Sequence, residues 1–196
     1  LTQMDRWLLA RLHSMIRDAT TAYESFDSAT VTRLVETFVE ELSTWYVRRN
    51  RRRFWKSDSD LDKQAAYQTL YEALTGVVRV IAPILPFTSE AMYQNLVRSV
   101  HPQAPESVHL LQWHKAEEAL VDQTLLDEME VVLKVVTMGR SVRTDARLQV
   151  RQPLAKILVK PKDQNQTAML QKLQDQILEE LNVKSLAFIQ DEAEVA

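Results

Sequence analysis

The chain has 196 residues, of which 45% are hydrophobic, enough to bury the core of one sizeable domain with or without a small appendage. It has no cysteine, which excludes disulfides, thiolate zinc sites and cysteine nucleophiles, and its net charge at pH 7 is −3. No apolar run approaches the roughly 20 residues that a membrane span needs, and no stretch resembles a signal peptide, so we expect a cytoplasmic protein with no membrane partner.

The first part of the chain predicts three amphipathic helices. Apolar residues at three- and four-residue spacing run from Leu8 to Phe26, and Thr2 or Asp5 can cap this helix. A second apolar stripe runs from Val31 to Tyr46, and a third covers residues 61–81. Residues that can cap the second and third helices precede these stripes: Asp27, Ser28 and the polar segment 57–60.

The second helix leads into a basic segment, residues 48–56, with no carboxylate in it. Its six cations are Arg48, Arg49, Arg51, Arg52, Arg53 and Lys56. Because an α-helix turns about 100° per residue, these side chains cannot share one face, so we expect the segment to project beyond the helical core. Trp45 and Trp55 bracket it, and cations interleaved with aromatic rings suit a nucleotide, which presents a phosphate and a flat base. A solvated helix face is the alternative reading.

Prolines separate the third helix from a fourth. Pro83 and Pro86 end the third helix because each lacks a backbone donor and disfavours helix in the preceding residue. Thr88 is the expected N-cap of the fourth helix, with Phe87 placed to pack against Met92. We therefore expect a tight link between two neighbouring helices.

The last part of the chain changes its period. Residues 101–114 predict a surface loop, and a fifth helix runs from about residue 118 to residue 139 or one turn further. Beyond Arg147, a strand, a helix and a second strand are predicted between Leu154 and Ile189. The expected fold is mainly α.

We expect two domains. Residues 1–146 form a five-helix antiparallel bundle, because the helices are joined by mostly short links. Residues 147–196 form a small strand–helix–strand α/β element, too short to fold comfortably alone, which packs on the bundle or begins a further C-terminal domain.

A second basic segment covers residues 134–162, where eight cations accompany Asp145 as the one carboxylate. Taking both basic segments from the totals of 24 cations and 27 acids leaves 10 cations against 26 acids elsewhere. This segregation predicts positive patches on an acidic body, which would localise an anionic partner. The candidates for nucleic-acid contact here are Arg140, Arg143, Arg147 and Arg151, of which the first three would line one face of the fifth helix if it continues that far.

The sequence offers no self-contained active site. Gly76 and Gly139 are the only glycines, so no phosphate-binding loop is possible. The histidines lack metal-ligand spacing, and we expect no metal site and no catalytic residue. Adjacent glutamates such as Glu179 and Glu180 point about 100° apart on a helix and are expected to be solvated carboxylates.

Four motifs, in this order, resemble the anticodon-binding region of isoleucyl-tRNA synthetases, of a eukaryote-like subtype, between Asp5 and Ile189. The motifs are Asp5-Arg6-Trp7-Leu8-Leu9, residues 45–55, Ala82-Pro83-Ile84-Leu85-Pro86-Phe87-Thr88-Ser89-Glu90 and Val150-Arg151-Gln152-Pro153-Leu154. The family's two ATP-site signatures are absent. The resemblance implies a module that positions tRNA(Ile) for a catalytic domain, which would hold ATP and magnesium.

The resemblance also implies where RNA binds. The corner between the second and third helices faces the anticodon loop in related synthetases, which places Arg51, Arg52, Arg53 and Trp55 near unpaired bases. The other partner expected is the catalytic domain of the same polypeptide. We expect the protein to be a monomer. Two alternatives stay open, a bundle whose arginines dock the catalytic domain and a generic helical protein-interaction module.

Overall fold

The computed structural model describes residues 1–56 and 59–190, and the chain divides into two units, Leu1–Asp122 and Gln123–Ala196. The described part is mainly helical with one small sheet, as the sequence predicts. Part of the predicted cap of the third helix, residues 57 and 58, lies outside the described residues. None of the described helices is long and apolar enough to cross a membrane.

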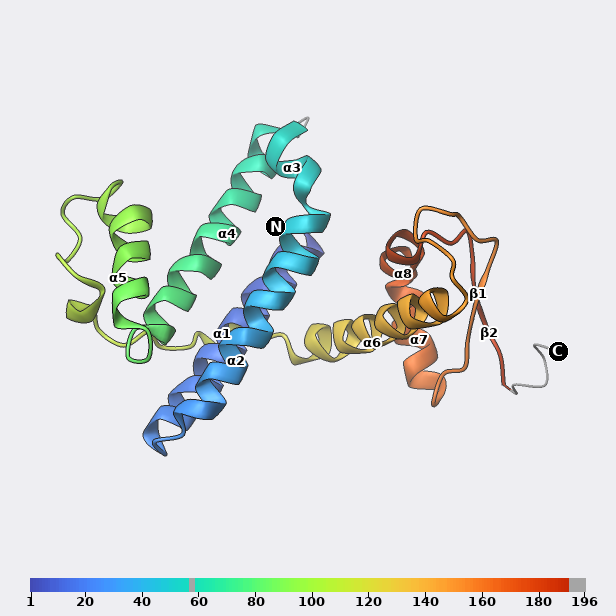
Figure 1. Ribbon diagram of the computed structural model, residues 1–196, viewed down its shortest axis with the longest axis horizontal. Helices are drawn as coiled ribbons and strands as arrows, with labels where there is room; N and C mark the ends of the chain where they lie inside the picture. Colours follow the sequence, from blue (N-terminus) through green and yellow to red (C-terminus); the bar gives the residue numbers. More distant parts are fainter. Residues whose placement is uncertain (57–58, 191–196) are drawn as a thin grey trace. The chain divides into compact units, whose positions relative to one another are not determined.

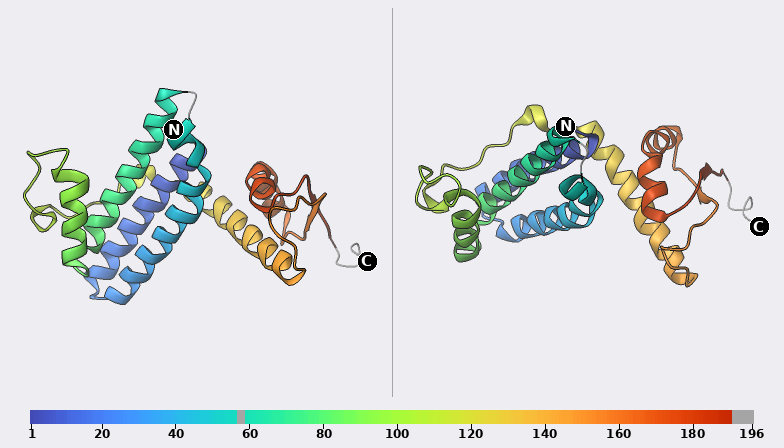
Figure 2. Two further views of the ribbon diagram at one scale, coloured as in Figure 1. Left: turned by 45° about the horizontal axis from the view of Figure 1, so that its top comes forward. Right: turned by 90° about the horizontal axis from the view of Figure 1, so that it is seen from above.

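Three long helices lie side by side in the first unit (Figure 1): α1 (Gln3–Glu24), α2 (Ser28–Glu41) and α4 (Asp60–Ile81). Figure 2 shows the same packing from two further directions. Their predicted apolar stripes form the core, since Leu8, Leu12 and Phe38 are completely buried. The prediction is wrong at two ends of the stripes, where Phe26 and Leu61 are exposed. Thr2 caps α1 through a capping box, in which the Thr2 hydroxyl accepts from the Asp5 N–H and the Asp5 carboxylate accepts from the Thr2 N–H.

The second predicted helix continues beyond α2 in a modified form. It passes through a π-helical segment, η1 (Leu42–Val47), and then into the short helix α3 (Arg51–Lys56). Asp27 caps the start of α2 and Ser59 caps the start of α4, each accepting a hydrogen bond from a backbone N–H three residues on. The basic segment therefore forms the corner between α2 and α4, at the end of the three-helix core.

The fourth helix differs from its prediction at the start. Helix α5 (Pro86–Tyr93) begins with Pro86 in its first turn and continues as η2 (Gln94–Arg98), so Thr88 lies inside the helix and is not its N-cap. The predicted packing of Phe87 is also wrong, because its side chain is 89% exposed. The buried partner of this region is Tyr93, which packs with Val78 and Val108 and donates to the Pro105 carbonyl at 2.8 Å.

The second unit is built on α6 (Gln123–Asp145). This helix contacts α7 (Gln164–Lys172) and α8 (Gln174–Leu181), and strands β1 (Ile157–Val159) and β2 (Leu186–Phe188) pair in parallel. The loop before α6 contains the 3-10 turns η3 (Val108–Leu110) and η4 (Glu118–Leu120). The division between the units therefore falls before the fifth helix, whereas the sequence favoured a boundary at residue 146. The reason is that the apolar stripe of α6 serves the core shared with α7 and α8.

Candidate nucleic-acid interface

Helix α3 is fixed by two adjacent side chains, Arg53 and Phe54, that point inward. Phe54 is 7% exposed and lies between two rings, with centroid distances of 6.3 Å to Tyr46 and 5.2 Å to Tyr67 in edge-on geometry. Both contacts have the edge-to-face arrangement, one of the two that aromatic pairs prefer. A buried phenylalanine next to an arginine therefore anchors the basic corner to the core.

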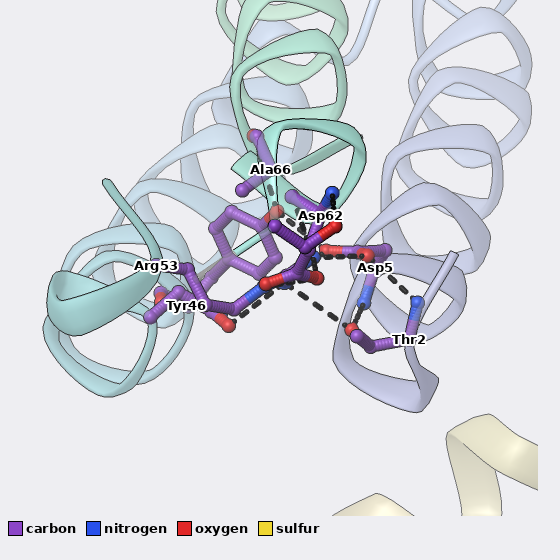
Figure 3. Close-up of polar contacts among 8 residues, drawn as sticks. Thr2, Asp5, Tyr46, Arg53, Asp62 and Ala66 are labelled. Carbon is purple, nitrogen blue, oxygen red and sulfur yellow. Dashed lines mark hydrogen bonds and ion pairs between the residues drawn. The ribbon is translucent and has the colours of Figure 1, made fainter. Parts of the chain in front are cut away.

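Arg53 lies in a partly buried ion-pair network that joins α1, α3 and α4 (Figure 3). Its Nη1 and Nη2 donate to the two carboxylate oxygens of Asp5 at 2.8 and 2.9 Å. Its Nε lies 2.9 and 3.0 Å from the carboxylate oxygens of Asp62, and Nη1 also donates to Asn50 Oδ1 at 2.9 Å. All three guanidinium nitrogens thus have internal acceptors, so Arg53 is a structural residue and the prediction that it contacts RNA has no support here.

Asp5 is the centre of this network and is completely buried. Burial alone would raise its pKa, but hydrogen bonds from Arg53, Tyr46 and Thr2 outweigh that effect and lower the pKa to about 2. The pKa of Tyr46 is raised, mainly by burial and also by the Asp5 carboxylate, to which the Tyr46 hydroxyl donates at 2.7 Å. At neutral pH the network therefore contains an ionised carboxylate, a neutral phenol and a guanidinium.

The other side chains of α3 face solvent. Arg51, Arg52 and Lys56 are exposed, and Trp55 has 72% of its surface exposed. The Arg51 Cζ lies 5.2 Å from the centroid of the Trp55 ring, within cation–π range, because the two residues are four apart on the helix. The accessible part of the predicted interface on α3 therefore consists of this arginine–tryptophan pair together with Arg52 and Lys56.

Residues 48 and 49 extend the basic corner toward η1. Arg48 is exposed and its Nε donates to the Thr44 carbonyl at 2.9 Å. Arg49 is half-buried, with Cζ 5.9 Å from the ring centroid of Trp45. Trp45 itself is 6% exposed and belongs to the core, as expected for a residue within the apolar stripe from Val31 to Tyr46. Of the two tryptophans that bracket the segment, Trp55 is the accessible one.

Two of the four candidates in the second basic segment have partners inside the second unit, and one of them, Arg143, is buried. Arg143 is 4% exposed and donates to the carbonyls of Leu181 at 2.7 Å, Gln149 and Gln152 at 3.0 Å, and Asn182 at 3.3 Å. It ties the end of α6 to the segments before β1 and β2, so the predicted RNA contact of Arg143 is unsupported.

Arg140 pairs with the carboxylate of Glu180, which is 7% exposed. That contact also overturns the expectation that Glu180 is solvated.

Most exposed cations of the second unit lie beyond α6, although Lys134 within the helix is also exposed and pairs with Glu130. Helix α6 ends before Arg147, which has a φ of 54°. Arg147 therefore does not share a helix face with Arg140 and Arg143, an arrangement that the sequence predicted for a helix continuing that far. Arg147 and Arg151 are exposed. Three further cations of the second basic segment, which were not among the candidates for nucleic-acid contact, are also exposed: Lys156, Lys160 and Lys162. Five exposed cations therefore lie on the chain between residues 147 and 162, and Lys172 and Lys184 are exposed further along it.

Two histidines of the first unit are structural. His13 is 1% exposed, and its Nδ1 accepts from the Glu117 N–H at 3.1 Å. Burial, assisted by the charge of Arg79, lowers the pKa of His114 to about 4, so this imidazole is neutral at pH 7. Within the described residues, no group of three or more His, Asp and Glu side chains could hold a metal ion.

Comparisons with known proteins show which family this chain belongs to. Residues 5–159 match the family described as "Anticodon-binding domain of tRNA ligase". Over 94% of this chain, 48% of residues are identical to an isoleucine–tRNA ligase of Dehalococcoides mccartyi, and over 98% of it, 47% are identical to one of Thermus thermophilus. The chain spans 18% and 19% of the lengths of these two relatives.

Proposed function

Because this chain belongs to the anticodon-binding domains of tRNA ligases, we propose that it is the part of an isoleucine–tRNA ligase that binds tRNA(Ile) at its anticodon loop. In this role it holds the tRNA while a catalytic domain of the same polypeptide attaches isoleucine. The module itself contributes binding and orientation.

The observation that carries the proposal is the exposed face of α3. Trp55 offers a flat ring, with Arg51 stacked on it, and Arg52 and Lys56 lie on the same short helix. An unpaired base can stack on such a ring with a gain of about 1–3 kcal/mol, while the cations neutralise neighbouring phosphates. Unpaired bases are the natural target, because the deep major groove of an A-form stem hides its base edges.

The second unit supports the same function with charge and without aromatic rings. Arg147 and Arg151 are exposed, as are Lys156, Lys160 and Lys162. We assign to them contacts with phosphates, which add affinity but carry no base specificity. Arg53 and Arg143 are not part of this assignment, because their donors are engaged inside the protein, and Arg140 is left out because it pairs with the buried carboxylate of Glu180.

The chemistry of aminoacylation lies elsewhere in this proposal. ATP and magnesium belong to the catalytic domain, whose signature motifs this sequence of 196 residues lacks. We propose that the parent enzyme acts as a monomer in the cytoplasm, where tRNA and ATP are available. Isolated, the 196-residue chain binds tRNA without turnover.

A salt titration of tRNA(Ile) binding tests the proposal. If α3 and its neighbours neutralise about 4 phosphates at a single-stranded loop, log K plotted against log salt concentration has a slope near −3. A flat response contradicts the proposal. Equal affinity for tRNA(Ile) and for an unrelated RNA hairpin of the same length indicates a generic interaction module instead.

A Trp55→Ala variant separates the remaining alternative. If the basic corner docks a catalytic domain and RNA binds elsewhere, the substitution leaves tRNA affinity unchanged. If Trp55 stacks on a base, affinity falls while the salt slope stays near its original value, because no cation is removed.

A further inference from the structure

We propose that Asp5 and Asp62 are positioning residues for RNA binding. Acting through Arg53, they fix the rotation of α3 about its own axis, and so they decide which of its side chains face the RNA. This inference rests on the proposed function, since it assigns a task to residues that never touch the nucleic acid.

Helix α3 needs such a device because it is short. It has six residues, and isolated helices of that length are unstable in water. Two of its side chains, Arg53 and Phe54, contact the core, while the other four are exposed. Whatever holds Arg53 and Phe54 therefore determines the direction in which the exposed side chains point.

Phe54 and Arg53 restrain α3 in different ways. Apolar burial is non-directional, so the Phe54 ring holds α3 against the core without fixing its rotation closely. A guanidinium is planar and its donors point in fixed directions, so a paired arginine has one preferred orientation. Because successive residues are about 100° apart on a helix, fixing Arg53 also fixes the Arg51–Trp55 pair.

Two carboxylates from different helices hold the guanidinium (Figure 3). Asp5 lies in the first turn of α1 and is itself held by the Thr2 N–H at 2.8 Å and the Tyr46 hydroxyl at 2.7 Å. Asp62 lies in the first turn of α4, and its carboxylate oxygens are 2.9 and 3.0 Å from Arg53 Nε. With acceptors on both sides, the guanidinium cannot turn without breaking at least one ion pair.

Electrostatics alone predicts the opposite effect of removing these carboxylates. Asp5→Asn or Asp62→Asn deletes one negative charge next to a cationic surface, so attraction for phosphates should rise. If the carboxylates act by orienting α3, the same substitutions weaken RNA binding despite the added positive charge. The sign of the change in affinity therefore separates positioning from simple charge.

The experiment compares three variants of the 196-residue chain by filter binding to a tRNA(Ile) transcript at fixed salt. Asp5→Asn and Asp62→Asn remove the network carboxylates with almost no change of shape. Asp60→Asn is the matched control, because Asp60 is exposed in the same first turn of α4 and makes the same change of charge. We expect the control to bind as tightly as the parent or more tightly, and both network variants to bind about fivefold or more weakly, as the loss of one stacked base implies.

Asp62→Asn keeps the test valid if Asp5→Asn does not fold, because Asp62 has 36% of its side chain exposed and its loss leaves the buried Asp5–Arg53 pair intact. Circular dichroism establishes folding before binding is measured.

Trp113 is also 37% exposed, so iodide quenching is measured in a Trp113→Phe background, where it reports the exposure of Trp55 because the side chains of Trp7 and Trp45 are buried. In the unsubstituted 196-residue chain, tRNA should protect Trp55 from iodide. In a folded Asp62→Asn variant this protection should be reduced. A change in stability alone would leave it intact.

Distinct results overturn the two proposals. If the parent does not bind tRNA(Ile), the proposed function fails. If the parent binds and folded Asp62→Asn binds as tightly or more tightly, with full protection of Trp55, the positioning role is wrong while the proposed function stands.

Discussion

Replacing Arg143 with Met should destabilise the second unit and leave RNA contacts in the first unit untouched. The guanidinium donates to four backbone carbonyls, and methionine fills part of the space without donating to any of them. Two of these carbonyls, of Gln149 and Gln152, belong to exposed residues and regain water after the substitution. The other two, of Leu181 and Asn182, lie at the end of α8, where Leu181 is 1% exposed.

The magnitude follows from that division. Hydrogen bonds from a charged donor contribute about 1.5–3 kcal/mol each, and a buried carbonyl left unpaired costs about 1–3 kcal/mol. The bond to Leu181 counts fully, whereas the bond to Asn182 is longer at 3.3 Å and counts partly. We therefore expect a loss of about 2–4 kcal/mol in the free energy of unfolding of the second unit.

Native-state hydrogen exchange measures this loss where it occurs. The Leu154 N–H donates to Asn182 O and the Lys184 N–H to Leu154 O, so both amides report the pairing that Arg143 supports. They should exchange faster in Arg143→Met, by the factor that corresponds to the lost free energy. Arg147→Met is the matched control, because Arg147 is exposed. Unchanged exchange together with weaker tRNA binding would refute the structural role of Arg143.

Two further predictions concern the first unit. Because the folded-state pKa of His114 is lowered to about 4, the unfolded chain binds one more proton than the folded chain between about pH 6.5 and pH 4. The His114 contribution to stability should therefore be complete above about pH 6.5 and be lost as the pH falls toward 4. In urea unfolding measured at several pH values, His114→Phe should reduce this dependence, whereas His109→Gln, at an exposed position, should not. Tyr46→Phe removes the hydroxyl that donates to Asp5 and should cost about 1–3 kcal/mol in thermal unfolding, because the charged acceptor stays buried; a cost near zero would show that Asp5 is satisfied without it.

Helical stripes made most of the fold predictable. The apolar spacing in α1, α2 and α4 reflects burial of one face, and residues such as Leu12 and Val35 were placed correctly because their environment is local to the stripe. The start of α5 was missed because Pro86 fits the first turn of a helix, so a proline that ends one helix can begin the next.

The division of the basic corner was not predictable from periodicity. In a run of arginines each side chain looks equivalent, and what distinguishes Arg53 is Asp5, 48 residues earlier in the chain. A signal did exist for Arg143, which continues the buried stripe of Val132 and Val136 at helical spacing. An arginine in line with core residues is typical of a paired structural cation, because burying an unpaired charge is costly.

The affinity of Trp55→Ala for tRNA(Ile) tests the central claim most directly. Phe87→Ala is the control, since Phe87 is an even more exposed aromatic side chain in the same unit, 89% exposed against 72% for Trp55. Filter binding at fixed salt should show that Trp55→Ala loses about fivefold to a hundredfold in affinity, the equivalent of one stacked base, while Phe87→Ala binds like the parent. Equal affinities for all three proteins would contradict the claim that α3 presents a base-stacking surface.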